Sequence, residues 1–107
     1  MRTILLVLMA VMPPLTSVAA RAADRQAGRA KAAACALCHG QNGISTLANT
    51  PNLAGQPAMY VEAQLKNYRS GARRHEVMSL VAKPLSDADI ADLAAWYASI
   101  RIEPTLP

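Results

Sequence analysis

Two cysteines and a histidine lie within five consecutive residues, Cys35-Ala36-Leu37-Cys38-His39. On a helical turn this C-x-x-C-H spacing places both sulfurs on one side, where they can form thioethers with the two vinyl groups of a porphyrin. His39 follows the second cysteine directly, which places its imidazole beneath the iron as an axial ligand. The motif therefore predicts one haem attached covalently through Cys35 and Cys38, with His39 bound to the iron.

Two other kinds of site use the same residue types. Catalytic C-x-x-C disulfides lie at the start of a helix that follows a strand, and no strand pattern precedes Cys35. A structural zinc site takes four ligands, usually as two closely spaced pairs. His75 could be the fourth zinc ligand, but it has no nearby partner, and the adjacent Cys38 and His39 would strain a tetrahedron. Haem attachment is therefore the favoured interpretation.

A second axial ligand decides whether the iron carries electrons or reacts with a substrate. If a leader is removed, Met59 and Met78 are the thioether candidates. Met59 lies at the start of an amphipathic stretch, where packing accounts for it. Met78 lies in a segment without helical periodicity, from which a loop can direct its sulfur toward the face opposite His39. His75 competes as a ligand, although residues 73–76 have the composition of a solvated turn. We expect Met78 to be the sixth ligand.

The first 23 residues have the pattern of a secretory signal peptide. Arg2 gives a positive start, residues 4–12 are apolar and uncharged, and small residues follow. The apolar run is shorter than the roughly 20 residues that a membrane-spanning helix needs. Export to the periplasm is therefore expected, with no stable membrane anchor after cleavage. Cleavage is expected after Ala20, Ala22 or Ala23, which leaves one domain of about residues 24–107.

The basic character of the whole chain overstates the charge of this domain. The chain has a formal charge of +4, but cleavage after Ala23 takes away Arg2 and Arg21 and leaves nine basic against seven acidic residues. The longest basic run is the doublet Arg73-Arg74. Binding to nucleic acid is therefore not expected.

The predicted domain is all-α, because no segment shows the alternating pattern of a strand. Alanines at helical spacing predict a first helix over residues 24–38, and a loop rich in Asn, Thr, Pro and Gly follows over 40–56. Pro57 opens a second helix that ends at Gly71. An irregular stretch over 72–85 is expected next.

The last predicted helix has the clearest start. Ser86 is its N-cap, and an aspartate stands three residues later, at Asp89. Its apolar face is bulky, with Leu93, Trp96, Tyr97 and Ile100 at helical spacing. A first helix surfaced by alanine and glycine could pack closely against this face.

Taken together, the residues resemble the class I cytochromes c, in particular the small bacterial monohaem proteins and the single domains of di-haem cytochromes. The resemblance covers the whole mature chain. It rests on the C-x-x-C-H motif followed by Gly40, on residues 51–56, on the segment 64–73, and on Met78 followed by residues 85–90.

The resemblance implies a small fold of three to five helices around one covalently bound haem c, with the N- and C-terminal helices crossing. Gly28 takes the place where these two helices cross, next to Trp96, and the Pro51 carbonyl accepts a hydrogen bond from the ligand histidine. Met78 takes the place of the axial methionine. Gln64, Arg69 and Arg73 resemble positions that approach the haem propionates, while a solvated helix face explains them equally well.

The implied function is one-electron transfer in the periplasm, not enzyme catalysis. With His39 and Met78 both bound, the iron has no open position for a substrate. Redox partner proteins, a donor and an acceptor, are expected to dock transiently through a small interface. The alternatives are a cytochrome subunit of a larger dehydrogenase or oxidase complex, a gas-binding or catalytic haem protein with a vacant sixth position, and a thiol or zinc module without haem.

Overall fold

The computed structural model describes Met12, Pro14 and residues 21–107, and the described part contains helices and no strand. The prediction of an all-α fold with three to five helices is confirmed. The predicted signal peptide falls mainly outside the described residues. The five helices are α1 (Arg25–Lys31), α2 (Ala36–His39), α3 (Ala58–Ser70), α4 (Met78–Ala82) and α5 (Asp87–Ser99).

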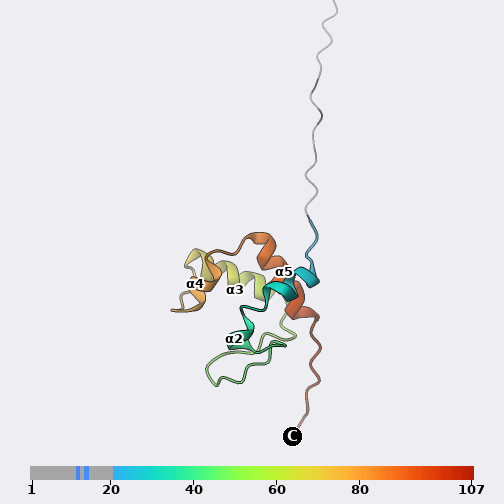
Figure 1. Ribbon diagram of the computed structural model, residues 1–107, viewed down its shortest axis with the longest axis vertical. Coiled ribbons are helices and arrows are strands. Elements are labelled where there is room, and N and C mark those ends of the chain that lie inside the picture. Colours follow the sequence, from blue (N-terminus) through green and yellow to red (C-terminus); the bar gives the residue numbers. More distant parts are fainter. Residues whose placement is uncertain (1–11, 13, 15–20) are drawn as a thin grey trace, which may run out of the picture.

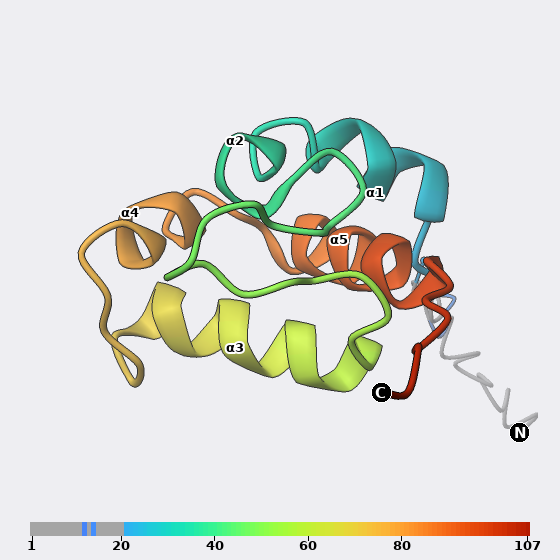
Figure 2. The ribbon, with the colours of Figure 1, turned by 90° about the horizontal axis from the view of Figure 1, so that it is seen from below.

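The C-terminal helix α5 forms the centre of the fold. Helix α1 packs against α5, and α3 packs against both α5 and α4. Figure 2 shows α3 along one edge of the domain and α1 with α2 along the other, while the long loop between α2 and α3 crosses in front of α5. Both views place α2 and α4 toward the same side of α5 (Figures 1 and 2). The predicted contact between the terminal helices is confirmed.

The crossing of α1 and α5 depends on the missing side chain of Gly28. A Cβ atom on this residue would lie 1.9 Å from the carbonyl oxygen of Asp92 and 3.0 Å from the Cβ of Trp96. The two helix backbones therefore touch at Gly28, which only glycine allows. The expected place of Gly28 beside Trp96 is confirmed.

The first helix is shorter than predicted. It ends at Lys31, and the chain makes a turn before α2 begins at Ala36. Helix propensity favours continuing through these alanines, but it is a weak preference that packing overrides. Ala32 is buried, and Cys35 packs against the core formed by Ala32, Leu93 and Tyr97. The prediction of one continuous helix over 24–38 was therefore wrong.

Helix α3 begins and ends, and helix α5 begins, as the sequence predicts. Pro57 precedes α3, and Gly71 ends it in the left-handed conformation with φ 86°. The Ser86 side chain accepts a hydrogen bond from the Asp89 N–H, and the Asp89 carboxylate accepts one from the Ser86 N–H. This capping box fixes the start of α5. Ile100 is the residue that follows the helix, not its last turn.

Helix α4 lies in the stretch that was predicted to be irregular. The backbone N–H groups of Val77 and Met78 donate to Nδ1 of His75, at 3.2 and 3.3 Å. The Ser79 hydroxyl accepts from the His75 N–H at 3.0 Å. A histidine that caps a short helix in this way is not among the usual N-cap residues. The sequence pattern therefore missed this helix.

Candidate haem-binding site

The two cysteines of the motif lie on either side of the start of α2. Cys35 is half-buried and immediately precedes the helix, while Cys38 lies inside it and is exposed. Both thiols are free, so no disulfide joins them. Within the described residues, no group of three or more His, Cys, Asp or Glu side chains could hold a metal ion. The described residues therefore assemble neither the disulfide nor the zinc alternative.

The histidine of the motif is held by the backbone of the following loop. His39 is the last residue of α2 and only 8% exposed. Its Nδ1 lies 2.8 Å from the carbonyl oxygen of Pro51. Because a carbonyl can only accept, the proton of the ring is on Nδ1 and the lone pair is on Nε2. This is the tautomer and orientation that a metal-binding imidazole needs.

The loop that carries Pro51 is closed by backbone hydrogen bonds to one glycine. The Gly43 carbonyl accepts from the N–H groups of Leu53 and Ala54, at 2.8 and 3.0 Å. Gly43 has φ 74°, and a Cβ on it would lie 2.7 Å from the Ala54 nitrogen. The loop therefore depends on glycine at this position, and the closure fixes where the Pro51 carbonyl points.

Two further polar residues support this loop and were not singled out by sequence reasoning. The Ser45 hydroxyl donates to the carbonyl of Cys38 at 3.0 Å. The Ser45 N–H donates to the Asn52 side-chain oxygen at 2.7 Å. Together they connect the motif helix to the residue after Pro51. The composition of the loop, rich in turn-forming side chains, was the available sequence signal.

The surroundings of Cys35 favour a neutral sulfur. Burial raises the pKa of the Cys35 thiol, and the neighbouring Tyr97 only partly opposes this. Burial, together with the nearby Cys35, also raises the pKa of Tyr97. A thiolate is therefore disfavoured at this place. An uncharged thioether suits it, because it carries no charge into the core.

Met78 is the first residue of α4 and is half-buried. It lies on the helix that is on the same side of α5 as α2, which carries His39 (Figures 1 and 2). Met59 does not take the packing role predicted for it, because it is 85% exposed. His75 is exposed, and its Nδ1 is occupied by the two N–H groups at the start of α4. Of the three candidates for a second ligand, Met78 is the one whose side chain is not exposed.

Known proteins of similar sequence identify the family of this chain. The cytochrome c family profile matches residues 25–101. The chain belongs to the cytochrome c family. It is 43% identical over 88 residues to cytochrome c4 of Pseudomonas aeruginosa, covering 82% of this chain and 44% of that protein. It is 44% identical over 81 residues to cytochrome c-554(548) of Halomonas halodenitrificans, covering 73% of this chain and 98% of that protein.

Other relatives of this cytochrome are longer. The "thiosulfate dehydrogenase electron acceptor" of Thiomonas intermedia is 43% identical over 72 residues, covering 66% of this chain and 33% of that protein. The crystal structure of reduced cytochrome c4 from Pseudomonas stutzeri superposes with a TM-score of 0.70 at 37% identity, covering 75% of this chain and 47% of that chain. The chain thus spans about half the length of the cytochromes c4 that it matches.

The family fixes the cofactor and the class of activity. This cytochrome carries a single c-type haem, with Cys35 and Cys38 in the positions of the attachment cysteines. The donor chemistry at the site fits this group, because two free thiols and an imidazole with an available Nε2 lie on one short helix or directly before it. The family is one of electron carriers and is not enzymatic.

The three polar residues considered for the haem propionates make other contacts. Arg69 donates to the carbonyl of Leu85 at 2.9 Å and to the Asp87 carboxylate at 2.6 Å. Arg73 donates to the Gln64 side-chain oxygen at 2.7 Å. Arg69 therefore joins α3 to the start of α5. Its role is structural, and it is not simply part of a solvated helix face.

A buried carboxylate that sequence reasoning missed anchors the N-terminal segment. Asp92 on α5 is fully buried. It accepts from the Lys31 ammonium at 2.7 Å, from the Asp24 N–H at 2.8 Å and from the Arg21 guanidinium at 3.2 Å. These hydrogen bonds hold the pKa of Asp92 well below its usual range, the Lys31 bond most strongly. An aspartate between Ile90 and Leu93, on an apolar helix face, was the available signal.

Proposed function

We propose that this chain is an exported one-electron carrier whose haem iron is held between His39 and Met78. Cys35 and Cys38 attach the haem covalently. The observation that carries the proposal is the hydrogen bond from His39 Nδ1 to the Pro51 carbonyl, which leaves Nε2 available at the end of the C-x-x-C-H motif. The half-buried position of Met78 at the start of α4, on the same side of α5 as α2, supports its assignment as the second ligand.

The haem, when bound, supplies reversible one-electron exchange between ferric and ferrous iron. The protein residues determine which chemistry is open to it. His39 and Met78 would hold the iron through an imidazole and a thioether, and they would then leave no position for a substrate or a gas. A thioether ligand also favours the ferrous state relative to a second nitrogen ligand, which raises the reduction potential.

We place the protein in the periplasm. The support is the signal-peptide pattern of residues 1–23, which leaves residues 24–107 as the haem domain. Within the described residues, no helix combines the length and the apolar character that crossing a membrane requires. Export also agrees with the covalent haem. Cysteines of exported proteins usually form disulfides, whereas Cys35 and Cys38 would both be used in thioether bonds to the haem.

The partners are other redox proteins that bind transiently. Some relatives are named as electron acceptors of thiosulfate dehydrogenase, and one matched structure is a thiosulfate dehydrogenase, of which this chain covers 22%. This favours a second candidate function, in which the chain is the cytochrome subunit of a larger dehydrogenase or oxidase complex. Both candidates use the same iron site and differ only in whether the partner stays bound. Co-purification from the native host separates them.

The ligand assignment is tested with Met78→Ala and the matched control Met59→Ala, both in haem-loaded protein. Met78→Ala is expected to keep its covalent haem, to lower the reduction potential by on the order of 0.1 V, and to bind carbon monoxide when reduced at neutral pH. Met59→Ala should behave as wild type, because the side chain is exposed. An unchanged potential and no carbon monoxide binding in Met78→Ala would exclude the proposed ligation.

A further inference from the structure

The net charge of the domain is concentrated in one short segment. Residues 24–107 contain nine basic and seven acidic side chains. Three of the basic residues, Arg73, Arg74 and Lys83, and one of the acidic residues, Glu76, lie within residues 73–83. The six remaining basic residues are balanced by six acidic ones. The whole excess of positive charge therefore comes from the end of the α3–α4 connection and from α4.

These charges are open to solvent. Arg73, Arg74 and Lys83 are exposed, and within the described residues none of them has a carboxylate partner within 4.0 Å. The basic residues nearby on α3 differ in this respect. Arg69 is paired with Asp87 at 2.6 Å, and Lys66 is paired with Glu62. Arg25, Arg29 and Arg101 are also exposed and have no carboxylate partner within 4.0 Å among the described residues, but they lie on α1 or after α5. Arg73, Arg74 and Lys83 are thus the cations that a partner approaching α4 meets.

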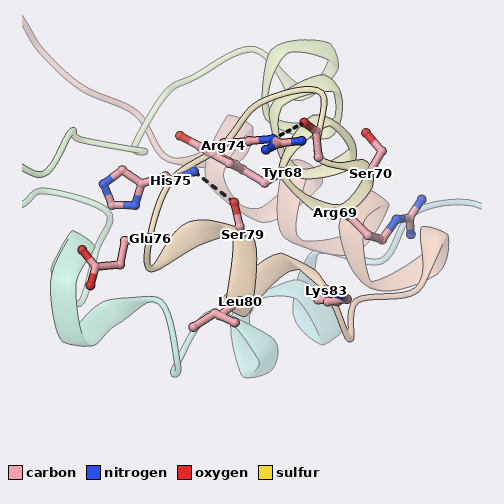
Figure 3. Close-up of a pocket in the computed structure, with 10 residues that line it drawn as sticks. Tyr68, Arg69, Ser70, Arg74, His75, Glu76, Ser79, Leu80 and Lys83 are labelled. Carbon is pink, nitrogen blue, oxygen red and sulfur yellow. Dashed lines mark hydrogen bonds between the residues drawn. The ribbon is translucent and has the colours of Figure 1, made fainter.

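An open groove of about 630 Å³ lies between the end of α3 and α4. Figure 3 shows Arg74, His75, Leu80 and Lys83 around it, with Glu76 at one side. Apolar side chains accompany the charges. Leu80 is 72% exposed, and Val77 and Val81 on the same segment are 50% and 40% exposed. We call these residues the α4 face: Arg73, Arg74, Glu76, Val77, Leu80, Val81 and Lys83.

The α4 face combines the two features of a specific docking surface. Exposed apolar side chains supply area that binding can bury, while charged residues around them set orientation and speed up encounter. The same helix begins with Met78, the proposed iron ligand. A protein docked there is close to the iron site. The opposite end of the domain, where α1 crosses α5, lies away from α4 (Figures 1 and 2).

We propose that the α4 face docks an electron-transfer partner whose own contact surface is acidic. The proposal rests on the proposed function and adds the site and the charge of the partner. Local positive charge attracts an acidic surface toward the part of the protein through which electrons pass. Because the face is small and its charges remain solvated, binding is transient and depends on ionic strength.

The test uses inorganic oxidants of opposite charge on the haem-loaded protein. Reduced protein is mixed with ferricyanide, a trianion, or with tris(phenanthroline)cobalt(III), a trication, at low ionic strength. The double variant Arg74→Glu with Lys83→Glu is compared with Arg25→Glu and Arg101→Glu together. Both pairs consist of exposed residues and change the net charge by the same amount, but only the first pair lies on the α4 face.

The α4-face variant is expected to slow oxidation by ferricyanide about tenfold or more and to accelerate oxidation by the cobalt complex. The control should change either rate less than about threefold, and all differences should vanish near 1 M salt, where screening is strong. Equal effects in both double variants would overturn the proposal, because net charge alone would then explain them. Unaltered visible spectra show that folding and ligation are intact. Failure here with those spectra overturns the docking face and leaves the proposed function standing.

Discussion

The Nδ1 atom of His39 lies 2.8 Å from the carbonyl oxygen of Pro51, twelve residues further along the chain. This hydrogen bond means that the position of the Pro51 carbonyl in the loop determines which tautomer His39 adopts. The loop in turn is closed on the carbonyl of Gly43. The orientation of the His39 ring on α2 therefore depends on the conformation of the α2–α3 loop.

Gly28→Ala is expected to destabilise the domain by about 2–3 kcal/mol. The added Cβ would lie 1.9 Å from the Asp92 carbonyl oxygen, so the crossing of α1 and α5 must open. Thermal unfolding of the haem-loaded protein measures the loss.

Gly71→Ala provides the comparison for this variant. A Cβ at Gly71 has no atom within 4 Å, but the residue has φ 86°. It should therefore cost only about 1 kcal/mol of backbone strain. A loss in Gly28→Ala no greater than that in Gly71→Ala would contradict the described helix crossing.

In His75→Ala, Met78 is expected to remain the iron ligand but to dissociate from the iron more often. The variant leaves the N–H groups of Val77 and Met78 without their capping acceptor, a loss worth about 1 kcal/mol. An iron whose thioether ligand opens more often should bind cyanide roughly fivefold faster. His75→Asn, which can still accept, should restore most of the wild-type rate. Identical cyanide kinetics in all three proteins would show that the cap does not support Met78.

Acid sensitivity should depend on the carboxylates that join α1 to α5. Hydrogen bonds and Lys31 hold the pKa of Asp92 well below its usual range. A hydrogen bond from the Ser86 N–H, followed by one from Lys31, lowers the pKa of Asp89 to about 2. Because both pKa values are depressed in the fold, their stabilisation is fully present above the unfolded value of about 4 and is lost as pH falls from there toward 2.

Asp92→Asn tests this dependence. It should lower the thermal midpoint at neutral pH and flatten the fall of the midpoint between about pH 4 and pH 2. The matched control Glu62→Gln removes an exposed i,i+4 pair with Lys66 and should change neither. A pH profile of Asp92→Asn parallel to that of wild type would rule out this role for the buried carboxylate.

Much of the fold could be predicted because local rules and the global fold agree. The capping box at Ser86 and the left-handed Gly71 are set by residues within one turn, so the end of α3 and the start of α5 follow from the sequence. The end of α1 could not be predicted in this way. It is decided by Cys35 packing against Tyr97, a contact between residues distant in sequence.

In the candidate site, too, local sequence predicts some features, while others depend on contacts between residues distant in sequence. The C-x-x-C-H spacing identifies the cofactor because its geometry is local. The role of Asp92 depends on contacts with Lys31 of α1 and with Arg21 and Asp24, which precede that helix, and no sequence period encodes these contacts. Helix α4 escaped prediction because His75, and not one of the usual N-cap residues, accepts from the N–H groups of Val77 and Met78 at its start.

Covalent haem on Cys35 and Cys38 is the central claim, and the most direct measurement is acid extraction. The protein is exported by a host that matures c-type cytochromes, and the visible spectrum is recorded before and after extraction with acidified organic solvent. Wild type should retain its colour on the polypeptide, while Cys35→Ala with Cys38→Ala should lose it entirely. Wild-type protein that emerges colourless, with both thiols free or joined to each other, would contradict the account.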